Sequence, residues 1–300
     1  MIHIRSIFKH IGLFIDFIKS PRYTPVYKNK CSGKCFVLVN GPSLKKTLEK
    51  YDEGSLVITN DSIMVNLAAL DFHFWKIKPK HMCFADAMFY RDYPPKKDAI
   101  RENFRLLNAN VDWDLNIYTC YRYAKEHDKF VKYSEIKNPH IHIIRMNRLA
   151  CDEWHPRFWN KLLSSGYFMP LVGSVGNVAL HVALLSGYKN IELYGVDHNQ
   201  FLEFSVNDDN QLCSLDSHFY DNSNKIKANP VISTWNSTER QRRISEYMYT
   251  MFVMFKGHEI HAKWAQEIGA HILNCTPNSM IDSFDRIGKD GKIHKGQMNK

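Results

Sequence analysis

The chain has 300 residues, which is enough for one large domain or two small ones. Hydrophobic residues make up 44% and charged residues 24%, as in packed globular proteins, and the lack of any run of eighteen apolar residues excludes a membrane-spanning helix. The formal net charge of +9 favours anionic partners such as phosphorylated ligands or an acidic membrane surface.

Residues 1–24 form a basic, apolar N-terminal segment that ends in a proline-containing linker. Such a segment is typical of an amphipathic anchor lying in the plane of a membrane, and the alternative is a helix packed on its own domain. Seven cysteines are present, and only Cys31 and Cys35 lie close together. We therefore expect reduced thiols in a cytoplasmic protein, associated peripherally with the inner face of the membrane.

Residues 25–284 alternate short apolar runs with helical patterns, which predicts one catalytic domain. The expected strands cover 35–40, 55–60, 81–86, 115–120, 141–147, 190–197 and 271–276. The expected helices lie near 43–51, 95–107, 122–132, 174–187 and 237–269, the last interrupted at Gly257. This alternation predicts an α/β fold with a Rossmann-like, doubly wound, mostly parallel sheet.

Two segments depart from the alternation. Residues 198–236 are rich in Asn, Asp and Ser and too long for a routine connection, so we expect an inserted lid or binding loop. Residues 285–300 are rich in lysine and glycine and are expected to form a frayed basic tail.

Polar residues follow several of the expected strands. In an open parallel sheet the ligand crevice lies outside these carboxyl ends, at the point where the strand order reverses. Polar residues at the carboxyl ends of several strands therefore predict a site that binds a nucleotide. The residues concerned are Asn40 with Gly41, Asn60 with Asp61, Asp86, Asp197, and Thr276 with Asn278.

The sharpest motif is NGPSL at residues 40–44, between a strand and a helix. Gly41 permits a tight turn, Pro42 can begin the helix, and Ser43 can cap it or bind a phosphate. The N–H groups and dipole of such a helix start favour an anion, although an ordinary strand–helix turn is the alternative. The chain has neither a GxGxxG nor a Walker motif here, which argues against the usual NAD(P) enzymes and kinases.

A second motif, GSVGN at residues 173–177, opens a strongly apolar helix. Its small residues permit close approach of a ligand to the backbone, and Ser174 and Asn177 can bind a sugar or base. His181 on the same helix is expected to be structural. Asp197 either contacts the ligand or caps the next turn.

NGPSL, Asn60, the helix start at 173–176, GYKNIELYGVD and the final CTPNS occur in an order that resembles the bacterial sialyltransferases of glycosyltransferase family 42. The resemblance covers about residues 35–282. It implies a single GT-A-like domain with a lid, a CMP-activated acidic sugar as donor, a glycan hydroxyl as acceptor, and an inverting reaction with no cofactor. The expected role is surface polysaccharide or lipooligosaccharide synthesis.

The same resemblance implies roles for individual residues. Asn40, Gly41 and Ser43 would hold the donor phosphate and ribose, and Asn60 would contact the nucleotide. Ser174 and Gly176 would line the sugar pocket, and Gly195 would lie near the cytosine. Asn278 and Ser279 would close the site. His218 in the lid would be the general base, and Tyr220 would help to stabilise the departing phosphate. The lid differs from the family pattern in one respect. The family has a second histidine in the lid, the expected base, and the corresponding position in this chain falls near Asn222, so His218 matches the first histidine.

Asp86 stands where that family has an asparagine, and NGPSL, Asn60-Asp61-Ser62 and Phe84-Ala85-Asp86 also resemble proteins like the archaeal 6-hydroxymethylpterin diphosphokinase. That resemblance implies Mg²⁺ held by Asp61 and Asp86 during diphosphate transfer from ATP. The alternative is that one carboxylate caps a turn while the other pairs with a lysine. A non-catalytic scaffold is a third hypothesis.

The remaining motifs are weaker. Residues 112–114 imitate a metal-binding DxD motif. The aromatic residues at 154–159 are expected to form a packed loop, and the alternative is that they stack on an acceptor sugar. Residues 239–243 are expected to be a solvated basic run. His258 and His261 are expected on a surface helix face. No nucleic-acid-binding signature occurs, so nucleic acid is not an expected partner.

Overall fold

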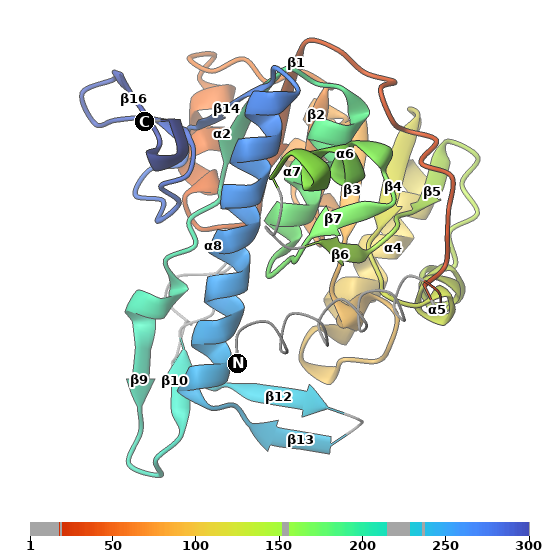
Figure 1. The fold of residues 1–300 in the computed structure, drawn as a ribbon. Coiled ribbons are helices and arrows are strands. Elements are labelled where there is room, and N and C mark those ends of the chain that lie inside the picture. Colours follow the sequence, from red (N-terminus) through yellow and green to blue (C-terminus); the bar gives the residue numbers. More distant parts are fainter. Residues whose placement is uncertain (1–17, 19, 152–155, 215–228, 236–237, 300) are drawn as a thin grey trace.

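The computed structural model describes residues 18, 20–151, 156–214, 229–235 and 238–299. A nine-stranded sheet lies at its centre, with helices on both faces (Figure 1). The strand order is β16-β15-β14-β8-β1-β2-β3-β4-β5, and every pairing in it is parallel except that of β15 with β16. The predicted α/β fold with a mostly parallel sheet is therefore confirmed.

The elements have the following bounds. The central strands are β1 (Lys34–Leu38), β2 (Ser62–Val65), β3 (His81–Phe84), β4 (Leu115–Thr119), β5 (Ile141–Arg145), β8 (Asn190–Tyr194), β14 (His271–Asn274), β15 (Asp285–Ile287) and β16 (Ile293–His294). The α-helices are α2 (Leu44–Asp52), α3 (Phe72–Ile77), α4 (Lys97–Asn110), α5 (Ala124–Ser134), α6 (Pro156–Ser165), α7 (Val175–Ser186) and α8 (Ile244–Glu267). Smaller sheets are built from β6 (Leu149–Cys151), β7 (Phe168–Pro170), β9 (Phe204–Val206), β10 (Leu212–Ser214), β11 (Asn229–Pro230), β12 (Ile232–Trp235) and β13 (Thr238–Gln241).

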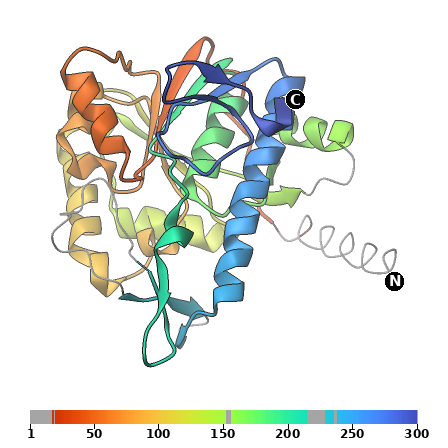
Figure 2. The ribbon, with the colours of Figure 1, turned by 90° about the vertical axis from the view of Figure 1, so that its left-hand side faces the viewer.

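The alternation of side chains along the strands produces two cores. In β1, Cys35 and Val37 face a core shared with α7 and α8, whereas Phe36 and Leu38 face a core shared with α2, α4 and α5. All four are buried, as expected for a central strand covered on both faces. Figures 1 and 2 show α8 extending past the sheet toward the β9–β10 and β12–β13 hairpins.

The second strand lies seven residues later than predicted. Residues 62–65 form β2, and each of these side chains is buried, whereas Val57 in the expected strand at 55–60 is 72% exposed. A strand in the middle of the sheet needs apolar residues on both faces, and only SIMV meets that requirement. Asn60 and Asp61 therefore precede β2, at the edge of the sheet opposite the carboxyl ends.

The last long helix is continuous through Gly257, contrary to the predicted interruption, and begins at Ile244 rather than near 237. A Cβ at Gly257 would lie 2.8 Å from the carbonyl oxygen of Leu171, so the glycine allows α8 to pack closely on the chain before α7. The ring of His258 lies beside His198, and that of His261 lies beside His181 of α7; the two residues are 1% and 0% exposed. The expectation of a surface helix face was therefore wrong.

The C-terminal residues join the sheet instead of forming a frayed tail. Strand β15 pairs with β14, and β16 pairs with β15. The buried carboxylate of Asp285 accepts hydrogen bonds from Lys295 Nζ at 2.9 Å and from the Gly296 N–H at 3.0 Å. Residues 156–159 of the expected packed loop belong to α6, which continues to Ser165.

Where it is described, the insertion at 198–236 contains β9, β10 and β11, which pair in one small sheet, and β12, which pairs with β13 just after the insertion. Residues 215–228, which include His218 and Tyr220, lie outside the described residues, as does nearly all of the N-terminal segment. The lid function and the membrane anchor thus stay predictions. In the described parts of the chain, no helix is long and apolar enough to cross a membrane.

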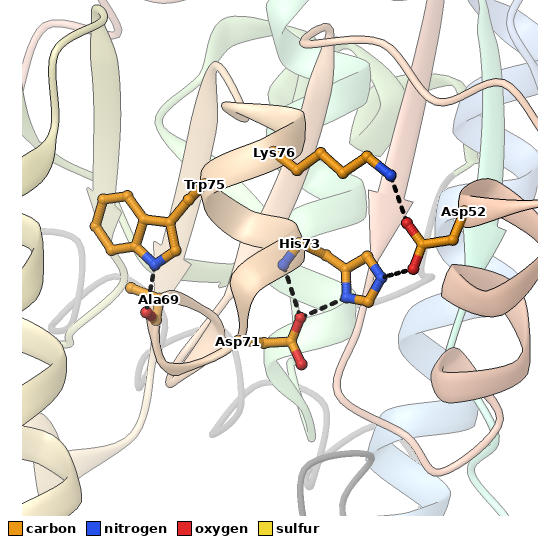
Figure 3. A network of polar contacts seen from close by, with 6 residues as sticks. All are labelled: Asp52, Ala69, Asp71, His73, Trp75 and Lys76. Carbon is orange, nitrogen blue, oxygen red and sulfur yellow. Dashed lines mark hydrogen bonds and ion pairs between the residues drawn. The ribbon is translucent and has the colours of Figure 1, made fainter.

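A polar network joins α2 to α3 (Figure 3). The ring of His73 lies between two carboxylates, with Nδ1 2.6 Å from Asp71 and Nε2 2.8 Å from Asp52. Asp71 also caps α3 by accepting from the His73 N–H. Hydrogen bonds from Lys76 and His73 lower the pKa of Asp52, and the one from Lys76 has the larger effect. This network fixes the end of α2 on the face of the sheet away from α7 and α8.

Candidate functional site

A cleft of about 550 Å³ lies at the carboxyl ends of β1, β2, β3 and β8. The chain runs from β1 to β2, β3, β4 and β5 on one side of β1, and later places β8, β14 and β15 on its other side. The order therefore reverses between β1 and β8, where ligands bind in sheets of this kind. The cleft opens at this reversal point, and its volume falls within the range of small-molecule sites.

Two residues bridge the reversal point. Ser43 Oγ donates a hydrogen bond to Asp197 Oδ2 at 2.9 Å, joining the turn after β1 to the end of β8. Burial raises the pKa of Asp197, and hydrogen bonds from the side chain and backbone of Ser43 oppose this rise. The carboxylate of Asp197 thus lies at the start of α2, beside Ser43, where the sequence motif predicted the phosphate of a ligand.

Gly41 and Gly195 let the two strand ends approach each other. The Gly41 N–H donates to the carbonyl oxygen of Gly195 at 2.9 Å. A Cβ at Gly41 would overlap the Asp197 carboxylate, and one at Gly195, which has φ +67°, would overlap the carbonyl oxygen of Val39. Both glycines line the cleft, and contacts within the protein already require their small size.

Three amide oxygens of residues that line the cleft have no hydrogen-bond partner among the described residues: Asn40 Oδ1, Asn66 Oδ1 and Gln200 Oε1. Asn40 is 5% exposed and is oriented by its Nδ2, which donates to the carbonyl oxygen of Val65 at 3.2 Å. A buried acceptor without a donor is costly, and a ligand hydroxyl or amino group would relieve that cost. These oxygens are therefore candidate acceptors for such donors once their side chains turn into the cleft.

The start of α7 forms another part of the wall. Ser174 caps the helix by accepting from the Asn177 N–H at 3.3 Å. Ser174 and Gly176 both line the cleft, and a Cβ at Gly176 would have only ordinary contacts of 3.4 Å or more. The N-terminal N–H groups and dipole of this twelve-residue helix suit an anionic group of a ligand. Gly173 has a different role, since a Cβ there would lie 2.8 Å from the backbone of Met254 in α8.

Three cationic side chains line the cleft: Arg91, Lys96 and Arg242. The guanidinium of Arg242 donates to Thr250 Oγ1 at 2.5 Å and lies 5.0 Å from the centre of the Tyr247 ring. Both of these partners come from α8 and also line the cleft. Arg242 is thus held in place before any ligand binds.

A pair of histidines lies at the side of the cleft. His198, 5% exposed, follows Asp197 and has its Nε2 3.0 Å from His258 Nε2 of α8. Burial lowers the pKa of His198 to about 3 and that of His258 well below its usual value. Both rings are neutral near pH 7, and one donates to the other.

The structure separates the two carboxylates proposed to hold Mg²⁺. Asp61 precedes β2 and Asp86 follows β3, so these parallel strands place them at opposite edges. By the β2–β3 register, Asp61 is level with residue 79, seven residues before Asp86, which separates the two by roughly 20 Å. Asp61 accepts from Tyr188 Oη at 2.8 Å and pairs with Lys80 at 3.4 Å. Asp86 caps a turn by accepting from the Met88 N–H at 2.9 Å, and it lines the cleft. Asn60 and Asp61 both lie outside the cleft.

The last predicted pair, Asn278 and Ser279, does not line the cleft. Ser279 is buried and donates to the carbonyl oxygen of Val196 at 2.7 Å, while the Val196 N–H donates to Thr276 Oγ1 at 3.1 Å. These contacts support the end of β8 from behind. Asn278 is exposed and has φ +56°.

Among the described residues, no group of three or more His, Cys, Asp or Glu side chains is arranged to hold a metal ion. In the DxD-like segment, Asp112 pairs with Lys78 at 2.7 Å, and its carboxylate is 67% exposed. This segment is therefore a surface feature away from the cleft.

The sequence interpretation missed Asn66, Arg91, Lys96, Arg242 and His198. A signal for Asn66 was present, because SIMVN ends like CFVLVN, with Val-Asn after an apolar run. Arg242 stood within the basic run at 239–243, where nothing in the sequence distinguishes it from its exposed neighbour Arg240.

Comparison with protein-family models gives no match for this chain, and comparison with curated proteins gives none either. The proposal below therefore depends on the geometry of the cleft and on the motifs described above.

Proposed function

We propose that the cleft binds a nucleotide-activated sugar and that the chain transfers this sugar to a hydroxyl group of a glycan. The favoured donor is a CMP-activated acidic sugar such as sialic acid. The observation that carries the proposal is the presence, in one cleft at the reversal point, of unpartnered amide oxygens, a helix N-terminus and three cations.

Each of these features suits one part of such a donor. The oxygens of Asn40 and Asn66 can accept hydrogen bonds from ribose hydroxyls or from the amino group of a cytosine. The start of α7 and the guanidinium of Arg242 can hold the phosphate, and Arg91 and Lys96 add positive charge for the sugar carboxylate. The phosphate is thus assigned to α7 rather than to α2, whose start is occupied by Asp197.

The proposed chemistry is attack by the acceptor hydroxyl as the nucleotide leaves with its phosphate. Oriented donors reduce the barrier where negative charge develops on that leaving group, and Arg242 and α7 are placed for this role. His198 is a poor candidate for the base, because its pKa of about 3 makes its neutral ring a weak proton acceptor. His218 therefore stays the proposed base, with Tyr220 assisting at the phosphate.

The diphosphokinase hypothesis loses its specific support from the residues. It required Asp61 and Asp86 to share one cation, and they lie at opposite edges of the sheet. The proposed transferase needs no metal ion.

Thermal-shift measurements with CMP, CDP, UDP, GDP and ATP, each with Mg²⁺ and with EDTA, test the proposal. A ligand that binds only the folded state stabilises it by about 2.7 kcal/mol at a hundredfold excess over Kd. We expect stabilisation by CMP that persists in EDTA. Stabilisation by ATP that requires Mg²⁺, or by no nucleotide, would contradict the proposal.

A further inference from the structure

A second cavity, a groove of about 990 Å³, lies between α4 and α5 on the face of the sheet away from α7 and α8. Its base is aromatic: Phe104 is 4% exposed, and Tyr90 and Tyr133 lie beside it, partly exposed. The rings of Phe104 and Tyr133 meet edge to face with centres 6.4 Å apart. The groove therefore offers aromatic surface to a ligand.

The rim of the groove is positively charged. Arg101 and Arg105 come from α4, Lys129 and Lys132 from α5, and Glu135 is the acidic residue among those that line it. Arg105 pairs with Glu102 at 2.6 Å, and Arg101 lies 3.9 Å from Asp92. In the part of the chain that the structure describes, no carboxylate pairs with Lys129 or Lys132, and both side chains are exposed. These two lysines are therefore available to an anionic ligand.

The groove and the cleft share one wall. The segment from Tyr90 to Arg101 contributes to both. Tyr90 and Arg101 line the groove, whereas Arg91 and Lys96, which lie between them in the chain, line the cleft. Hydrogen bonds fix this segment to α5, from Tyr90 Oη to Glu126 at 3.2 Å and from Tyr133 Oη to Asp92 at 3.2 Å. A chain-like ligand lying in the groove would thus have one end beside the cleft.

We propose that the groove binds an acidic glycan, the chain to which the sugar is added; this inference rests on the proposed transferase function. Carboxylate or phosphate groups on such a glycan would pair with Lys129, Lys132 and the two arginines. The apolar faces of its sugar rings would pack on Tyr90 and Tyr133, which are flat and lose little conformational entropy on binding. A neutral glycan would lack the first set of contacts.

The test measures binding of labelled oligogalacturonate to the full chain without nucleotide, with a neutral maltooligosaccharide of equal length as comparison. The double variant Lys129→Glu, Lys132→Glu removes two charge-assisted contacts and should weaken oligogalacturonate binding roughly tenfold or more. The control is Lys289→Glu, Lys292→Glu, which makes the same charge change at exposed positions near β15 and β16. Inorganic phosphate as a competitor shows whether isolated phosphate groups occupy the same positions.

Loss of oligogalacturonate binding in the groove variant, with the control unchanged, would support the proposal. Equal loss in both variants, or equal binding of the neutral oligosaccharide, would overturn it. Equally tight binding of a single-stranded DNA oligonucleotide, lost in the groove variant, would also overturn the assignment to a glycan. CMP stabilisation of the same variants reports on the cleft separately, so failure of the transferase proposal is distinguishable from failure at the groove.

Discussion

Ser43 Oγ donates a hydrogen bond to Asp197 Oδ2 at 2.9 Å, joining residues that are 154 positions apart in the chain. The bond crosses the point where the strand order reverses, so it connects the two halves of the sheet directly beside the cleft. It also places a carboxylate at the start of α2. The sequence motif predicted the phosphate of a ligand at this position, and the structure places the Asp197 carboxylate there.

Replacing Ser43 with Ala removes a donor from the partly buried Asp197 carboxylate. We expect a loss of about 1.5–3 kcal/mol in the free energy of unfolding at pH 7, typical of a hydrogen bond to a charged group. Burial already raises the pKa of Asp197, and the loss of Ser43 raises it further. The cost to stability is therefore greatest above that pKa, where Asp197 is ionised, and it shrinks as the pH falls and the carboxyl is protonated.

Urea unfolding of Ser43→Ala beside Ser55→Ala provides the measurement and its control. Ser55 Oγ donates to the Lys50 carbonyl oxygen at 3.0 Å, but this contact is exposed at the other end of α2. Equal effects of the two substitutions would show that the bond to Asp197 contributes nothing particular to stability.

Arg242 and Arg240 form a matched pair for testing the cleft. Arg242 lines the cleft, whereas Arg240 is exposed and pairs with Glu246 at 2.6 Å. We expect Arg242→Gln to weaken CMP binding roughly tenfold, the effect of one lost contact to a phosphate. Arg240→Gln should leave CMP binding unchanged. Titration calorimetry measures both affinities, and a similar loss in the two variants would remove Arg242 from the phosphate site.

The sequence predicted the parts of the site that depend on local patterns. An apolar run ending in Asn-Gly located the end of β1, and small residues before an apolar helix located the start of α7. The second strand was misplaced because two apolar runs flank Asn60 and Asp61. Choosing between these runs requires knowing which one is buried on both faces.

The remaining differences arise from tertiary contacts, which a local sequence pattern does not contain. Gly257 looks like a helix break in sequence, yet its missing side chain makes room for the Leu171 carbonyl group. Arg240 and Arg242 are alike in sequence, and only the course of the chain from β13 into α8 turns one outward and the other into the cleft. The partner of Gly257 lies more than seventy residues away in the chain, whereas Arg242 is held by Tyr247 and Thr250 of the helix that follows it.

His218→Ala tests the proposed general base. We expect transfer to slow by about 10²–10⁴-fold, the usual contribution of general base catalysis. CMP affinity should stay unchanged, because the nucleotide contacts are assigned to other residues. Release of CMP from CMP-sialic acid measures turnover, and calorimetry measures binding. An unchanged rate, or a loss of CMP binding, would remove His218 from this role.

Four buried histidines around α8 make the fold sensitive to acid: His181, His198, His258 and His261. Burial lowers the pKa of each of them, to about 3 for His181 and His198. The unfolded chain therefore binds more protons below pH 6.5 than the folded chain does. Each histidine is expected to lower stability by about 1.4 kcal/mol per pH unit as the pH falls from 6.5 toward its pKa in the folded state.

His261→Leu isolates one of these contributions. Neither ring nitrogen of His261 has a hydrogen-bond partner among the described residues, so an apolar replacement costs little at pH 7. Below pH 6.5 the variant should lose stability less steeply than the original chain, by about 1.4 kcal/mol per pH unit. Urea unfolding between pH 7.5 and roughly pH 5 measures the slope. The exposed His140→Gln serves as the control, and an unchanged slope in His261→Leu would mean that this ring accepts a proton in the folded state.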